Sequence, residues 1–255
     1  TGKNPIQVAE RLFQVIERLA ENGPMGIMDL SAELGFHKST THRLVTSLQY
    51  MGYIRQDEES LKYALSLKFL EIGSKILEQT NMASLIHPSL KKLSEQTGET
   101  VHLVRREGTE AVYIDKVEST VSSIRMVSRV GSRIPLYCSG VGKALLAELP
   151  DPEIEDIWNS SEITSLTPYT VTSLSDLMDR IRGVREAGFA MDDEENEEGV
   201  RCIAVSIPDY HKEPVYALSI SAPVSRMTDA RIAELSTDVL TFKKDLEKTL
   251  GFSRS

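Results

Sequence analysis

The sequence predicts an α+β protein in two parts: an N-terminal winged helix-turn-helix and a C-terminal domain with a mostly antiparallel sheet. Between residues 27 and 50, two helical apolar patterns are separated by a glycine, and two short strand-like segments follow them. From residue 98 onward the apolar period changes to that of strands, with helical patterns between and after them. The 255 residues are enough for two domains with cores of their own.

The first predicted helix opens near Pro5, and its apolar stripe ends before Asn22–Pro24. We expect this helix to pack beneath the helix-turn-helix. A second helix covers Ile27–Leu34 and stops at Gly35, a residue that commonly terminates helices. The short link that follows leads into a third helix, which completes the helix-turn-helix arrangement.

The third helix has one apolar and one polar face. Four residues have the spacing of a buried helix face: Thr41, Leu44, Val45 and Leu48. No Asp or Glu occurs between Leu34 and Gln56, although the chain has 38 acidic residues against 29 Lys and Arg. Carboxylates would be repelled by phosphates, so this window favours a DNA-facing helix over a merely solvated one. We expect DNA contacts from seven residues: Lys38, Ser39, Thr40, Thr41, His42, Arg43 and Arg55.

Two short strands around the polar turn Asp57–Ser60 predict a wing after the third helix. A linker helix follows; it is too small to fold alone and is a candidate for pairing with a second copy. The predicted domains are the winged helix-turn-helix at residues 1–65, the linker helix at 66–80 and the second domain at 81–255.

Charge and composition limit the classes of function. The net charge is −9, but residues 1–80 carry 9 basic and 10 acidic residues, so most of the acidity belongs to the second domain. No apolar run is long enough to span a membrane, and the N-terminus has no signal-peptide core. Cys138 and Cys202 form neither a disulfide framework nor a metal-ligand spacing. We therefore expect a cytoplasmic protein without a metal, a cofactor or a membrane partner.

In the second domain, hairpins are expected at Glu99–Arg106 with Ala111–Val117, and at Val200–Ile207 with Pro214–Ser221. A further strand is expected at 124–128. We expect helices to cover one face of this sheet. The predicted helices are residues 82–97, 142–149, 152–159, 173–187 and 228–250.

Two polar stretches of this domain are candidate sites. Ser139–Lys143 looks like part of a phosphate loop, but Tyr137 stands where the motif needs its first glycine and Ala144 where it needs a hydroxyl. What is left is a glycine-rich turn whose free N–H groups can hold a carboxylate, or a plain helix entry. Asp192–Glu198 is either a solvated acidic loop or a hard-cation site, without the spacing of an EF-hand. No catalytic constellation is present in the sequence.

Several stretches resemble a known family over nearly the whole chain: Lys38–Leu44, Gly52–Ile54, Ser139–Ala147, Asp192–Glu195, Gly199–Ala204 and Leu218–Val224. They are similar to the IclR-type bacterial transcription regulators. This resemblance implies a winged helix-turn-helix that binds double-stranded operator DNA and a GAF-like effector domain. It also implies a homodimer, often assembled as a dimer of dimers, that is, a homotetramer.

The resemblance further implies a small carboxylate effector, bound between the glycine turn and the sheet. Matching positions assign eight residues to it: Met126, Ile134, Gly140, Val141, Asp192, Cys202, Ser219 and Ser221. The chain departs from the family at His37, where many members have Pro, and at Thr41, where Val is common. Both departures bear on the operator sequence more than on the fold.

Four further stretches are similar to the branch of 2-keto-3-deoxygluconate repressors: Leu67–Gly73, Glu99–Leu103, Arg125–Tyr137 and Glu194–Gly199. Within them, Arg125, Arg129 and Arg133 are either partners for a sugar acid or surface charges. The function implied is a DNA-binding repressor whose operator affinity is controlled by a small carboxylate such as this sugar acid. The alternatives are an enzyme acting on a small acid with an appended DNA-binding module, or an IclR-type activator responding to glyoxylate, pyruvate or an aromatic acid.

Overall fold

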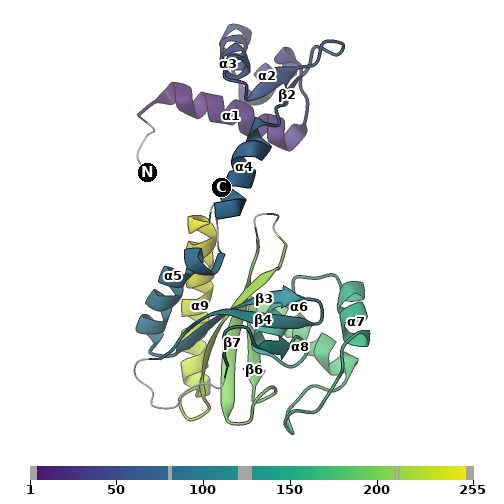
Figure 1. Ribbon diagram of the computed structural model, residues 1–255, viewed down its shortest axis with the longest axis vertical. Coiled ribbons are helices and arrows are strands. Elements are labelled where there is room, and N and C mark those ends of the chain that lie inside the picture. The colour runs from purple at the N-terminus through teal and green to yellow at the C-terminus, as the bar shows by residue number, and fades with distance from the viewer. Residues whose placement is uncertain (1–4, 80–81, 120–127, 210, 212, 251–255) are drawn as a thin grey trace. The chain divides into compact units, whose positions relative to one another are not determined.

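The structure is a computed structural model that describes residues 5–79, 82–119, 128–209, 211 and 213–250. The chain divides into two compact units, Thr1–Asn81 and Met82–Ser255. The first is helical with a small hairpin, and the second is a sheet with helices packed on it (Figure 1). The predicted α+β class, with an N-terminal helix-turn-helix and a C-terminal antiparallel sheet, is confirmed.

In the first unit the predicted helices and hairpin form close to their expected bounds. The second helix ends at Gly35, whose φ of 65° is the left-handed conformation expected of such a cap. The two wing strands pair antiparallel, with Arg55 opposite Ala64. The elements are α1 (Gln7–Asn22), α2 (Ile27–Leu34), α3 (Lys38–Tyr50), β1 (Ile54–Gln56), β2 (Tyr63–Leu65) and α4 (Lys68–Gln79).

The core of this unit is built from the apolar stripes that the sequence predicts. Val15 of α1, Leu30 of α2 and Val45 of α3 are buried together, with Ile54 of the wing beside them. Because these side chains fix α3 by its apolar face, the opposite face of α3 is held in solvent.

The second unit contains one six-stranded sheet in which every paired neighbour is antiparallel. Its strand order is β5-β4-β3-β8-β7-β6. The two predicted hairpin regions supply its four longest strands, and two short strands that the sequence did not predict lie at its edges. The strands are β3 (Thr100–Glu107), β4 (Glu110–Val117), β5 (Arg133–Pro135), β6 (Ala190–Asp193), β7 (Val200–Ile207) and β8 (Tyr216–Pro223). The strand predicted at 124–128 falls largely outside the described residues.

Helices cover both faces of this sheet, so the prediction of one covered face is wrong (Figure 1). Strands β7 and β8 are buried along most of their length, which is typical of strands packed on both faces rather than of strands with one wet face. On one face lie α5 (Met82–Thr97) and α9 (Asp229–Thr249). On the other lie α6 (Gly140–Leu146), α7 (Asp151–Asn159) and α8 (Leu174–Ala187).

Candidate functional site

The first candidate site is the polar face of α3. Lys38, Ser39, His42 and Arg43 are exposed there, Thr40 is half-buried, and Arg55 is exposed on β1. Thr41 differs, because its side chain is 0 % exposed and its hydroxyl lies 3.4 Å from the His37 carbonyl oxygen. Its predicted contact with DNA is therefore wrong, and Thr41 belongs to the core of the unit.

The wing tip has the opposite charge. The turn between β1 and β2 carries Asp57, Glu58 and Glu59, all exposed. The amide of Ser60 donates to the Asp57 carboxylate at 2.8 Å and its hydroxyl at 2.7 Å, and these bonds lower the pKa of Asp57. The turn is thus anionic at neutral pH, so the surface that attracts phosphate is α3 with Arg55 rather than the wing tip.

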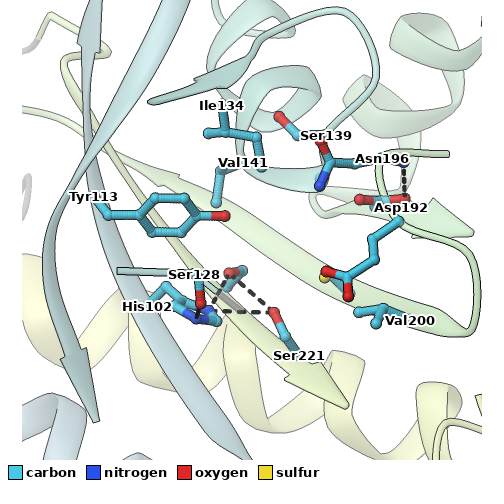
Figure 2. A pocket seen from close by; sticks show the side chains of 14 residues that line it. His102, Tyr113, Ser128, Ile134, Ser139, Val141, Asp192, Asn196, Val200 and Ser221 are labelled. Carbon is cyan, nitrogen blue, oxygen red and sulfur yellow. Dashed lines mark hydrogen bonds between the residues drawn. The ribbon is translucent and has the colours of Figure 1, made fainter. Parts of the chain in front are cut away.

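The second candidate site is a cavity of about 30 Å³ between the start of α6 and the sheet of the second unit. Figure 2 shows Tyr113, Ile134 and Val141 on one side and the polar side chains of His102, Ser128 and Ser221 on another. Among the described residues that line it there is no Lys or Arg. The full lining is His102, Tyr113, Ser128, Ile134, Ser139, Gly140, Val141, Asp192, Asn196, Glu197, Val200, Cys202, Ser219 and Ser221.

Strand register explains how these residues meet. Directly opposite residues of an antiparallel pair lie on the same face of the sheet. Asp192 of β6 pairs with Cys202 of β7, which pairs with Ser221 of β8. In the adjoining row, Ser219 of β8 pairs with His102 of β3. The polar residues of the cavity floor therefore lie in two neighbouring rows, one over β6, β7 and β8 and the other over β8 and β3.

A hydrogen-bonded cluster occupies one end of this floor. Nε2 of His102 lies 2.8 Å from the Ser128 hydroxyl, while Nδ1 lies 3.4 Å from that of Ser219 and 3.3 Å from that of Ser221 (Figure 2). The ring edge of Tyr113 packs against the imidazole, with centroids 5.2 Å apart. Burial, together with the Lys116 ammonium, lowers the pKa of His102 to about 3, so its imidazole is neutral at physiological pH.

Asp192 lies at the other end, under the start of the acidic loop. One of its carboxyl oxygens accepts from the amides of Glu195 at 2.8 Å and Asn196 at 3.4 Å. Burial raises the pKa of Asp192 to about 7, and the nearby Lys143 ammonium opposes that rise. At neutral pH this carboxyl is therefore partly protonated and can donate a hydrogen bond as well as accept one.

The acidic loop is solvated only in part: Glu197 and Glu198 are exposed, as the solvated interpretation predicts, whereas Asp192 and Glu195 are buried. Lys143 and Glu195 form an ion pair in which both side chains are 1 % exposed, and Arg180 approaches the same carboxylate at 3.4 Å. The Thr170 hydroxyl donates to the backbone carbonyl of Glu195 at 2.6 Å, and this bond also holds the loop in place. In the described part of the chain no group of three His, Cys, Asp or Glu is placed to hold a metal ion.

The glycine turn forms as a helix entry. Ser139 caps α6: its hydroxyl accepts from the Gly142 amide at 3.1 Å and donates to the Pro135 carbonyl at 2.6 Å. The amides of Gly140 and Val141 come before the first possible intrahelical bond, and both residues line the cavity. Free amides at this point can donate hydrogen bonds to an anionic or carbonyl oxygen of a ligand.

Both cysteines are free and are held as thiols. Burial raises the pKa of Cys202, which lines the cavity, and raises that of Cys138 to about 12. Thiols of this kind are weak nucleophiles, so Cys202 contributes shape and a weak donor to the cavity.

The structure brings together seven of the eight residues predicted for the effector, and the eighth, Met126, lies outside the described residues. Arg125 lies outside them too, while Arg133 pairs with Glu107 and Glu110 rather than with the cavity. Sequence reasoning did not assign the remaining seven lining residues. For His102 there was a usable signal, since it shares a strand face with Thr100, and Ser219 and Ser221 share one in the same way.

The first unit is thus a helix-turn-helix with a cationic, carboxylate-free face, and the second is a helix-covered sheet around a small polar cavity. This domain organisation is typical of a DNA-binding regulator that responds to a ligand. Two family models match the chain: the IclR helix-turn-helix domain at residues 8–58 and the C-terminal domain of the bacterial transcriptional regulator IclR at residues 74–247.

Relatives match along nearly the whole chain. The acetate operon repressor of Salmonella typhimurium is 36 % identical over 98 % of this chain and 92 % of its own. The regulator KdgR of Escherichia coli is 34 % identical over 98 % and 95 %. The structure of the Thermotoga maritima IclR superposes with a TM-score of 0.63, at 32 % identity over 96 % and 99 %.

This chain belongs to the IclR family of bacterial transcriptional regulators, and it carries the DNA-binding domain of that family. The prediction that it is not an enzyme is confirmed by this membership. Relatives with different names match at similar identity, so the similarity establishes the family rather than an effector. Among the described residues, no helix has both the length and the apolar character required to cross a membrane.

Proposed function

We propose that the protein is a repressor whose affinity for operator DNA is controlled by a small carboxylate bound in the cavity of the second unit. The observation that carries this proposal is the composition of the cavity: buried hydroxyls, free amides and a partly protonated carboxyl converge on one small space. Such groups recognise a compact polar ligand. The acetate operon repressor, a relative that matches 98 % of this chain, is named as a repressor and supports repression rather than activation.

On the DNA side, we propose that α3 enters the major groove. Arg43, Ser39 and Thr40 then contact bases or phosphates, while Lys38 and Arg55 mainly neutralise phosphate. His42 is exposed on the same helix and adds a donor. A homodimer, or a dimer of dimers, presents two such helices to successive grooves of a near-palindromic operator. In a bacterium this places its action in the cytoplasm.

The effector acts through differential affinity for two arrangements of the subunits. An acid that binds better to the arrangement with the wrong spacing of the two α3 helices weakens operator binding. By linkage, operator DNA then weakens binding of the acid by the same factor.

The size of the cavity bears on which acid this is. A water molecule requires about 10–15 Å³ of such a cavity. The cavity of about 30 Å³ therefore holds two or three water-sized groups. A short acid such as glyoxylate or pyruvate requires less movement of the lining than 2-keto-3-deoxygluconate or an aromatic acid does. We therefore propose the short acids ahead of the sugar acid.

The test is calorimetric titration of the full-length protein with pyruvate, glyoxylate, 2-keto-3-deoxygluconate and an aromatic acid. We expect saturable heat with at least one short acid, and loss of that heat in Ser221→Ala. Heat with 2-keto-3-deoxygluconate alone would overturn the size ranking. No heat with any of the four would overturn control by a carboxylate of these kinds.

A further inference from the structure

His102 has no role in the proposed function so far, although it is the residue that joins the two serines of the cavity floor to Ser128. Its side chain is 3 % exposed, and Ser219 and Ser221 are 4 % and 3 % exposed. Ser128 comes from the segment before β5, and the Lys116 ammonium holds its carbonyl oxygen at 2.8 Å. Ser128 is therefore tied to the sheet at two points, by its hydroxyl to the His102 imidazole and by its carbonyl oxygen to Lys116.

Two arrangements of the protons in this cluster are possible, one for each tautomer of His102. A neutral imidazole carries one N–H donor and one acceptor nitrogen. If Nε2 carries the proton, Nδ1 must accept and takes a hydroxyl proton from Ser219 or Ser221. If Nδ1 carries it, Nδ1–H donates to these serines, and Ser128 donates its hydroxyl proton to Nε2.

The distances favour the second arrangement, with the proton on Nδ1. The contact to Ser128 is short and single at 2.8 Å, near the length of a bond donated by a hydroxyl. The contacts from Nδ1 are longer and nearly equal, 3.4 Å to Ser219 and 3.3 Å to Ser221. Two equal, longer contacts are typical of one N–H shared between two acceptors. A single in-plane lone pair serves two hydroxyl donors less well.

We propose that Ser128 is a positioning residue: its hydroxyl proton fixes the Nδ1–H tautomer of His102, and this tautomer turns the Ser219 and Ser221 hydroxyl protons toward the ligand. The proposal rests on the effector function proposed above and adds the direction of its hydrogen bonds. The two serine oxygens lie 3.4 Å apart, and the Cys202 thiol can donate to Ser221, so even if one serine donates to the other, one hydroxyl proton is still available to a ligand.

The consequence is selectivity for a particular ligand chemistry. When both serine hydroxyls donate to the ligand, a carboxylate offers an acceptor oxygen to each of them. An amide of the same shape offers one acceptor oxygen and places its NH₂ group against the other donor, so the cluster favours a carboxylate over an amide. The opposite tautomer would consume one serine proton and leave an oxygen lone pair to receive a ligand donor.

Nitrogen NMR of the ligand-free, full-length protein labelled at histidine tests the tautomer directly. The sequence has five histidines, and the His102 signal is identified by its loss in His102→Gln. Should that variant not fold, the His102 signal is also expected to stay that of a neutral imidazole as the pH falls from 8 to 5, because burial lowers its pKa to about 3. We expect a protonated Nδ1 and a bare Nε2, and a shift toward the other tautomer in Ser128→Ala. A protonated Nε2 in the wild type, or no change in Ser128→Ala, would overturn the proposal.

Binding of pyruvate, with pyruvamide as the uncharged comparison, gives the functional readout. Ser128→Ala is expected to weaken pyruvate binding about fivefold, which corresponds to the loss of one net hydrogen bond. The ratio of the affinity for pyruvate to that for pyruvamide should also become smaller. Ser128→Thr, which keeps the hydroxyl, restores both, and His87→Gln on α5, outside the cavity lining, changes neither. If Ser128→Ala binds both probes as the wild type does, the positioning role is wrong while the effector function stands. If the wild type binds no acid, the effector function fails and the NMR result still decides the tautomer.

Discussion

Replacing Gly142 by Ala is expected to damage the second unit severely. A Cβ atom at this position would lie 2.1 Å from the Leu136 carbonyl oxygen and 2.3 Å from its Cα. The obstacle is backbone, so no rotamer change relieves it. Every residue of α6 is buried, and the whole helix must therefore move away from the segment that precedes it.

The magnitude follows from two opposing terms. Ala is favoured over Gly inside a helix by about 1 kcal/mol. Overpacking a buried site destabilises proteins by about 1–3 kcal/mol, and more where nothing can yield. With the clash on backbone atoms, we expect a net loss of about 3 kcal/mol in the free energy of unfolding. The shift of α6 also carries the amides of Gly140 and Val141 away from the cavity, so pyruvate binding weakens in whatever fraction folds.

The matched control is Gly183→Ala, in α8 of the same unit. A Cβ there meets no atom within 4 Å. This variant is expected to gain about 0.5–1 kcal/mol from helix propensity alone. Urea unfolding followed by circular dichroism compares the two variants. A Gly142→Ala protein as stable as the wild type, or a Gly183→Ala protein destabilised as strongly, would refute the reasoning.

Three further changes have expected outcomes. Arg43→Ala should weaken operator binding by about 1–3 kcal/mol if it contacts a base, and an unchanged gel-shift affinity would count against that contact. Since burial raises the pKa of Asp192 to about 7, its neutral, donating form is lost as the pH rises through 7. Calorimetry should then show pyruvate affinity falling about tenfold per pH unit well above 7, and no such slope in Asp192→Asn. Lys143→Met leaves the buried Glu195 carboxylate with only the half-exposed Arg180 as a cation, which should lower the free energy of unfolding by about 3 kcal/mol, and adding Glu195→Leu should recover most of that loss. A Lys143→Met protein that unfolds at the same urea concentration as the wild type would show that the ion pair does not matter.

The first unit was predictable because its signals are local. Helix period, the glycine stop at Gly35 and the turn at Asp57–Ser60 each act within a few residues of sequence. The error at Thr41 has a similar origin. It lies on both a buried helix face and a run of donors, and only the packing of α3 decides between the two.

The second unit was predictable in its long strands and less so in its edges. Strands β5 and β6 have three and four residues, too few to show a period. The acidic loop misleads for another reason: six acids in seven residues favour solvent, yet Asp192 and Glu195 turn inward because Lys143 and two backbone amides receive them. The composition of the loop itself does not predict an ion pair with Lys143, which lies far away in the sequence.

The seven cavity residues that were predicted correctly came from the family resemblance. The position of a residue such as His102, which was not predicted, depends on the order of the strands in the sheet. His102 meets Ser219 only because β3 and β8, far apart in the sequence, are neighbours in the sheet. Once that pairing is known, the rule that alternate residues share a face places His102 on the cavity floor.

The most direct test measures affinity for a duplex selected from a random library, over a range of salt concentrations, with and without pyruvate, glyoxylate and 2-keto-3-deoxygluconate. We expect a sequence-preferring complex whose log affinity falls linearly with log salt, by about 0.9 for each phosphate neutralised. We also expect at least one of the acids to weaken it. A protein with no salt-sensitive preference for any duplex, whether or not these acids are present, would contradict the account.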